Sequence, residues 1–325
     1  FHPDANRHLA PELREAVATI TKRVTEAYAV LRDPRRRQAY DRLLDDGTLF
    51  VARLDDDGRG EWLELSYGLG ALTEANGFTS QADVVLRCRE AADLAGATPL
   101  DRPEDVAVHP GNGRIYLACT QGTARGAEDD ESDAPLAPGA DAANPRAPNP
   151  YGHILEFAED GDDPVARTFA WEVFLLAGDP AQGLAAEPEP GRLTSAAAYY
   201  AGQTDSSGLS AFGCPDNLGF DAAGNLWIVT DGAQPLGSNN GCFVCPTEGP
   251  DRGRVRQFMS GPVGAEICGC TFSPDGDTLF LTIQHPGSGS SVESPSSHWP
   301  DGGDSQPRSS LIAIRSADAT RRFPG

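Results

Sequence analysis

The pattern of apolar and polar residues predicts a chain built mainly of β-hairpins. Three segments, 106–118, 218–229 and 270–282, repeat one arrangement: a short apolar strand, a turn rich in Pro, Asp, Gly and Asn, and a second apolar strand. Each turn contains a glycine, which can adopt the positive φ angle that tight hairpin turns require. Hairpins that recur in this way are typical of β-propeller blades. The predicted fold class is therefore all-β, with residues 47–325 forming a β-propeller domain.

Residues 12–44 show a different, helical periodicity. Apolar residues recur at spacings of three and four, and Asp33-Pro34 interrupts the pattern before it resumes. The apolar stripe consists of Val17, Ile20, Val24, Ala27, Tyr28 and Leu31. We therefore expect a short N-terminal α-helical segment. Its stripe has no partner helix within residues 1–46, so we expect it to pack poorly on the rest of the chain.

Three long segments separate the strands of the predicted propeller. Residues 122–150 are acidic and rich in Ala and Pro, residues 178–213 are weakly patterned, and residues 286–308 are rich in Ser, Gly and Pro. Such segments form long loops, which are either functional or disordered. At about 40–50 residues per blade, the remaining residues suffice for about four blades.

The chain is strongly acidic, with 26 Lys and Arg residues against 48 Asp and Glu and a net charge of −22. A surface with this charge repels nucleic acids and anionic membranes, so neither is an expected partner. It attracts cations, Ca²⁺ above all, although a general contribution to solubility explains the charge equally well. No apolar run approaches the roughly 20 residues that a membrane-spanning helix requires. The chain begins at Phe1 without a signal peptide, so we expect a fragment or a processed form.

The cysteines do not form an evident metal site. Their number is seven, so full internal pairing is impossible. The pairs Cys242/Cys245 and Cys268/Cys270 resemble zinc ligands, but they lie among strand signals and not in the loops typical of zinc ribbons. Buried thiols or one local disulfide are the favoured interpretation.

The first residues carry a known motif. His2-Pro3-Asp4 is followed by apolar helical residues and by residues 37–41, Arg-Gln-Ala-Tyr-Asp. Together they resemble the second half of a J-domain, whose His-Pro-Asp tripeptide stimulates the ATPase of an Hsp70-type chaperone. The first helix and the basic second helix of that domain have no counterpart here. We therefore interpret residues 1–46 as a J-domain-like helical fragment and do not expect an Hsp70-type chaperone as a partner.

From about residue 43 to the end, a series of short motifs follows the order of one known family. The matching segments are 44–53, 80–83, 101–104, 143–146, 149–154, 174–180, 215–217, 226–232, 261–266 and 283–286. In this order they resemble the PhoX family of alkaline phosphatases. The resemblance implies a six-bladed propeller, a periplasmic or secreted location, and hydrolysis of phosphomonoesters with Ca²⁺ and Fe³⁺ as cofactors.

The chain departs from the family pattern before residue 44. The family's early blades, which supply further metal ligands including a cysteine on iron, have no match there. The two resemblances meet at residues 42–47, where both families accept similar residues. Both the J-domain-like segment and the PhoX-like segment are incomplete. We therefore favour an error in the assembly of the sequence over a real fusion of two genes. The expected propeller is accordingly partial, with about four blades of a six-bladed family fold.

Three carboxylates are the candidate metal ligands. Glu104, Asp216 and Glu266 each lie at the start of an equivalent hairpin, so the repeat places them at one end of the propeller. Hard cations such as Ca²⁺ take six to eight oxygen ligands, and phosphate-ester hydrolysis uses such cations to neutralise developing charge. The alternative for each carboxylate is to cap a turn. The family resemblance favours the metal role for Glu104 and Glu266 and leaves Asp216 open.

Two further residues are candidates for catalytic contact with the substrate. Arg146 lies in a Pro-flanked loop, and a guanidinium matches the oxygens of a phosphate, unless the side chain is only a surface arginine. His285 ends a strand and has a donor for a phosphate oxygen or a leaving group, unless it only binds a turn. Asp231 follows a strand, and we assign it to a turn in preference to calcium. His109 and His153 lie within strand motifs and are predicted to be structural.

The sequence leaves three functions open. The first is a metal-dependent phosphomonoesterase acting on small phosphomonoesters. The second is a non-catalytic, calcium-binding propeller, and the third is a co-chaperone with a propeller domain. Because the early blades have no match, we expect weak calcium binding and little phosphatase activity from this chain.

Overall fold

The computed structural model describes residues 47–126, 139–317 and 323. The helix predicted for residues 12–44, and with it the J-domain-like fragment, lies outside the described residues. The predicted boundary between residues 46 and 47 therefore stays a prediction.

The first of two compact units contributes residues 47–50 and 64–91 to the described structure. It contains short helices that the sequence pattern did not predict, namely η2 (Glu74–Asn76), α3 (Gln81–Leu86) and half of α4 (Cys88–Ala95). Ser80 begins α3 by accepting a hydrogen bond from the Asp83 N–H at 3.2 Å, as an N-cap residue does. No helix in the described part of the chain is long and apolar enough to span a membrane.

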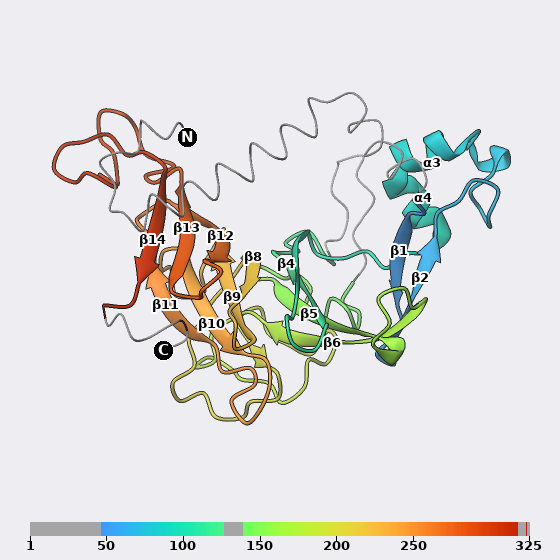
Figure 1. Cartoon of the computed structure of the whole chain (residues 1–325), viewed down its shortest axis with the longest axis horizontal. Coiled ribbons are helices and arrows are strands. Elements are labelled where there is room, and N and C mark those ends of the chain that lie inside the picture. The colour runs from blue at the N-terminus through green and yellow to red at the C-terminus, as the bar shows by residue number, and fades with distance from the viewer. Residues whose placement is uncertain (1–46, 127–138, 318–322, 324–325) are drawn as a thin grey trace. The chain divides into compact units, whose positions relative to one another are not determined.

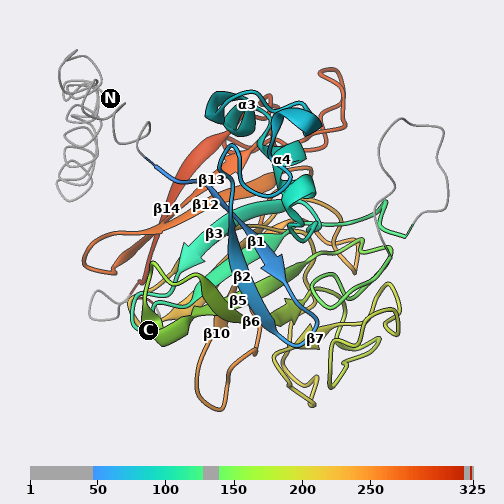
Figure 2. The ribbon, with the colours of Figure 1, turned by 90° about the vertical axis from the view of Figure 1, so that its right-hand side faces the viewer.

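The second unit contains residues 51–63 and those from 92 onward, and it is built of antiparallel sheets (Figure 1). The first sheet has the order β1-β2-β6-β5-β4-β3, and β7 pairs with β6. Its strands are β1 (Phe50–Leu54), β2 (Arg59–Glu64), β3 (Pro103–Val108), β4 (Ile115–Cys119), β5 (His153–Glu159), β6 (Thr168–Leu176) and β7 (Tyr199–Tyr200), and the short helix η3 (Asp160–Asp162) follows β5. Figure 2 labels β3, β5 and β6 of this sheet, and β4 lies between β3 and β5.

Two further sheets complete the second unit. One has the order β11-β10-β9-β8, and the other has the order β12-β13-β14. Their strands are β8 (Pro215–Phe220), β9 (Asn225–Thr230), β10 (Gly241–Pro246), β11 (Arg256–Ser260), β12 (Glu266–Phe272), β13 (Thr278–Gln284) and β14 (Ser310–Arg315). In Figure 1 these two sheets lie side by side, in yellow to red.

The three repeated segments form the predicted hairpins. β3 pairs with β4, β8 with β9, and β12 with β13, in each case antiparallel. The turn glycines Gly113, Gly224 and Gly276 have φ angles of 72°, 83° and 74°. Residues with a side chain are strained at such angles, which explains why glycine recurs in the motif. The prediction of hairpins at these three places is confirmed.

The first strands of these three hairpins are β3, β8 and β12, and β8 lies beside both of the others. We call these three neighbouring strands the inner row. Apolar cores fill the space between neighbouring sheets. One cluster joins residues of β4, β5 and β6 with residues of β8, β9 and β10, and another joins β9 and β10 with β12 and β13. Such stacked sheets are propeller blades, so the predicted all-β, partial propeller is confirmed. The described residues form three antiparallel sheets, of seven, four and three strands.

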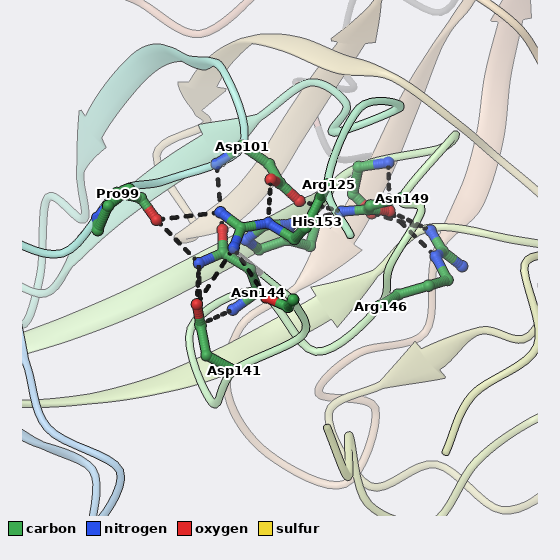
Figure 3. A network of polar contacts seen from close by, with 10 residues as sticks. Pro99, Asp101, Arg125, Asp141, Asn144, Arg146, Asn149 and His153 are labelled. Atoms are coloured by element: carbon green, nitrogen blue, oxygen red, sulfur yellow. Dashed lines mark hydrogen bonds and ion pairs between the residues drawn. The ribbon is translucent and has the colours of Figure 1, made fainter. Parts of the chain in front are cut away.

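A buried polar network fixes the loops next to β3 and β5 (Figure 3). The Nε atom of Arg125 donates to Oδ1 of Asp101 at 2.5 Å, and the two side chains are only 2% and 4% exposed. Asn149 donates to the other oxygen of Asp101 at 3.0 Å. Asn144 accepts from the Asp101 N–H at 3.1 Å and donates to the carbonyl oxygen of Pro99 at 3.0 Å. The described parts of the loop 122–150 are thus held by buried charges and amides.

The cysteines lie mostly inside the second unit. All seven are free, and Cys88 is exposed while Cys268 is half-buried. The interpretation as buried thiols is confirmed for the others, which are Cys119, Cys214, Cys242, Cys245 and Cys270.

Candidate functional site

The inner strands bring the three predicted carboxylates to one end of the propeller. Glu104 and Asp216 are the second residues of β3 and β8, and Glu266 is the first residue of β12. Hydrogen bonds between neighbouring inner strands fix this alignment. Oδ2 of Asp105 accepts from the Leu218 N–H at 2.9 Å, and Oδ1 of Asn217 accepts from the Gly269 N–H at 2.8 Å. The residues that start β3, β8 and β12 therefore share one edge of the molecule.

The carboxylates act on one another electrostatically. Burial, and after it the negative charges of Glu266, Asp231 and Glu104, together raise the pKa of Asp216 to about 6. Burial and the charge of Glu266 also raise the pKa of Asp231. We call these four residues, Glu104, Asp216, Asp231 and Glu266, the carboxylate cluster. Its charges repel one another, and that repulsion favours a bound cation.

His285 lies against this cluster. Its Nε2 atom is 3.0 Å from Oε2 of Glu266, and its Nδ1 atom is 3.4 Å from the carbonyl oxygen of Gly264. Partial burial opposes the charged form, but the contacts with Glu266 and Gly264 outweigh it and raise the pKa of His285 above its ordinary value. Its φ angle of 35° is rare for a residue other than glycine, and such strained residues concentrate at functional sites. Two of the residues predicted from sequence, Glu266 and His285, are therefore brought together.

Arg102 is a neighbour of the cluster that the sequence analysis did not single out. Its Nη2 atom donates to Oε1 of Glu104 at 2.9 Å, and 59% of its side chain is exposed. Its positive charge acts on Asp231, and its φ angle of 47° is also left-handed. The sequence did contain a signal for Arg102. This residue belongs to the family-like segment 101–104 and directly precedes Pro103, the first residue of β3. Asp231 was considered in the sequence analysis and assigned to a turn in preference to calcium, and that assignment stays a prediction.

Arg146 does not join this cluster in the described geometry. The side chain is 1% exposed, and its guanidinium donates to Oδ1 of Asn149 at 3.0 and 2.6 Å. It also donates to the carbonyl oxygens of Ala177 at 2.8 Å and Ala197 at 2.7 Å. Asn149 thus lies between Arg146 and Asp101 (Figure 3). All three guanidinium nitrogens thus donate to protein oxygens, and the contact of Arg146 with phosphate stays a prediction.

The two histidines predicted to be structural have structural contacts. Nδ1 of His109 accepts from the N–H groups of Gly111 at 3.0 Å and Asn112 at 3.1 Å, which closes the turn after β3. His153 is fully buried, and its Nδ1 atom lies 3.0 Å from Nδ2 of Asn149. Burial lowers the pKa of His153 to about 4, so it is neutral near pH 7.

The carboxylate cluster fits a hard cation by its chemistry but is not a closed coordination shell. Carboxylate oxygens are the ligands that Ca²⁺ prefers. Among residues 47–126 and 139–317, however, no three His, Cys, Asp or Glu side chains are arranged to hold one metal ion. The described side chains therefore do not form a complete metal site by themselves.

The raised pKa of Asp216 leads to a prediction of pH dependence. A carboxyl whose pKa is about 6 in the folded state and 3.8 in the unfolded state stabilises the fold below pH 4, and this contribution is lost as the pH rises through 6. Asp216→Asn is therefore expected to be about 1–2 kcal/mol more stable than the unmodified chain at pH 7, after allowance for solvent screening of a half-buried group. The two should be equally stable at pH 4. Urea denaturation at both pH values measures this, and equal stability at pH 7 contradicts it.

Comparison with known proteins identifies the family. The family model "Alkaline phosphatase PhoX" matches residues 29–287. This match begins inside the segment that we interpreted as J-domain-like, and no comparison shows a J-domain. No curated protein sequence matches the chain.

A solved structure is similar to most of the chain. It is described as Pseudomonas fluorescens PhoX in complex with vanadate, a transition state analogue, with 37% sequence identity and a TM-score of 0.68. The similarity covers 88% of this chain and 47% of the solved one, so the chain spans about half the length of that relative. The match to the family model over most of the chain, together with this similarity in sequence and fold, shows that the chain belongs to the PhoX family of alkaline phosphatases.

Proposed function

We propose that the chain hydrolyses phosphomonoesters in a metal-dependent reaction and that the carboxylate cluster binds Ca²⁺. The observation that carries this proposal is the alignment of Glu104, Asp216 and Glu266 at the starts of β3, β8 and β12, which hydrogen bonds between these strands fix. Burial and the negative charges of its neighbours raise the pKa of Asp216, in agreement with carboxylates that lie near one another. A bound cation offsets such charge. Family membership supports phosphatase chemistry, and the relative from Pseudomonas fluorescens binds vanadate, a transition state analogue.

The residues around the cluster have separate roles in this proposal. A bound cation supplies positive charge that offsets the charge developing on the phosphoryl oxygens. Arg102, exposed and next to Glu104, binds a phosphate oxygen through its free guanidinium donors. His285, with its raised pKa, holds a proton for the leaving oxygen. Fe³⁺, which the family resemblance implies, is the second proposed metal, and carboxylate oxygens of the cluster are its proposed ligands.

We further propose that turnover by this chain is slow. The described side chains form only part of a cation shell, and weak cation binding follows from that. A periplasmic or secreted location, as in the sequence-based expectation, suits an enzyme that uses Ca²⁺. The non-catalytic, calcium-binding propeller remains the second candidate, since it requires the same cluster without turnover.

Hydrolysis of p-nitrophenyl phosphate with added Ca²⁺ and Fe³⁺ tests this function. We expect a slow reaction that stops when the metals are chelated. Glu104→Gln and Glu266→Gln should each lower the rate at least about tenfold, because each removes a charged ligand. Glu293→Gln, which changes an exposed carboxylate in the loop 286–308, is the matched control and should leave the rate unchanged.

Two outcomes go against the proposal. A rate that neither substitution changes would show that the cluster takes no part in catalysis. Saturable Ca²⁺ binding without any hydrolysis would favour the non-catalytic propeller.

A further inference from the structure

The carboxylate of Glu266 is held by three donors of one hairpin. The Cys268 thiol donates to Oε1 at 2.8 Å, and the side-chain amide of Gln284 donates to Oε2 at 2.8 Å. His285 contacts the same Oε2 atom at 3.0 Å. Both oxygens are thus engaged, and the Glu266 side chain is only 13% exposed. A carboxylate with this many partners has one preferred orientation.

The strand register explains why these residues meet. Glu266 pairs directly with Gln284 across β12 and β13, so the two side chains lie on the same face of the hairpin. Cys268 follows two positions after Glu266 and therefore points to that face as well. Its own backbone is fixed, since Oγ1 of Thr282 donates to the Cys268 carbonyl oxygen at 3.1 Å.

The hairpin is also tied to the strand that carries Asp216. A β-bulge lies between Cys268 and Thr271, and within it Gly269 has a φ angle of 55°. This turn of the backbone lets the Gly269 N–H donate to Oδ1 of Asn217, the residue after Asp216. The donors that hold Glu266 are therefore fixed relative to the neighbouring carboxylate of the cluster.

We propose that Cys268 and Gln284 are positioning residues, which hold the Glu266 carboxylate in the orientation required for cation binding. Without their hydrogen bonds, His285 alone of these three partners would hold the Glu266 carboxylate beside the negative charges of Asp216 and Asp231. Groups that orient a metal-binding carboxylate in this way typically contribute 10- to 100-fold to affinity. This inference rests on the proposed function, because it assumes that the cluster binds a cation.

Terbium luminescence tests the inference without any measurement of catalysis. Tb³⁺ is titrated into the full chain, and Ca²⁺ then displaces it. We expect Cys268→Ala and Gln284→Ala each to weaken Tb³⁺ binding about tenfold. Cys268→Ser keeps a donor at the same position and should stay within about twofold of the unmodified chain. Gln257→Ala, at an exposed position of β11, is the matched control and should have no effect.

The outcomes separate this inference from the proposed function. If the unmodified chain binds Tb³⁺ and both alanine variants bind it equally well, the positioning role is wrong and the cation site stands. If Cys268→Ser weakens binding as much as Cys268→Ala while both melt normally, the hydrogen bond is not the cause and the inference is overturned. If the unmodified chain does not bind Tb³⁺, the proposed cation site itself is wrong.

Discussion

Arg125→Met is expected to lower the free energy of unfolding by about 3–5 kcal/mol, because it leaves the buried charge of Asp101 without its partner. Arg125 also donates to the carbonyl oxygens of Pro99 and Gly139, both at 3.1 Å, and these two hydrogen bonds are lost as well. Urea denaturation at pH 7 measures the change, with a shift of the midpoint at constant slope as the expected signature.

Two further variants make this prediction specific. Arg192→Met breaks an exposed ion pair with Glu189 and should cost less than about 1 kcal/mol. The double variant Arg125→Met with Asp101→Asn removes both buried charges, so it should recover part of the lost stability. A cost below about 1 kcal/mol for Arg125→Met alone would contradict the importance of the buried network for the loops around β3 and β5.

The double variant Glu104→Gln with Glu266→Gln is expected to lower Ca²⁺ affinity by about 100-fold or more, because the affinity of calcium sites depends on the number of charged ligands. In the unmodified chain, Ca²⁺ at about ten times its dissociation constant should raise the melting temperature by a few degrees. This rise should vanish in the double variant. Thermal unfolding with and without Ca²⁺ measures it, and an equal rise in both proteins contradicts the prediction.

The sequence was sufficient to predict which residues lie at the starts of equivalent hairpins. Each hairpin places its first strand in the inner row, and a carboxylate near the start of that strand then falls at one edge. This reasoning brought Glu104, Asp216 and Glu266 together although they are distant in the chain. It depended only on the alternation of apolar strands with glycine-containing turns, which is a local signal.

The sequence was not sufficient where burial and partners decide the role of a side chain. Arg146 and Arg102 both occur beside proline in polar segments, yet the first is buried among carbonyl oxygens and the second is exposed at the cluster. Asp231 follows a strand like many turn residues, and only the packing of β9 beside β12 brings it near Glu266. The contact between Cys268 and Glu266 needs the register of the hairpin as well as its existence.

The most direct measurement of the central claim is isothermal titration calorimetry of the full chain with Ca²⁺ at pH 6, in buffers of different ionisation enthalpy. The account predicts saturable heat and the release of about half a proton per ion, since Asp216 has a pKa of about 6 and has to ionise when a cation binds. It also predicts that Glu104→Gln with Glu266→Gln abolishes this heat. No saturable heat in the unmodified chain, or the same heat in the double variant, would contradict the claim that the carboxylate cluster is a cation site.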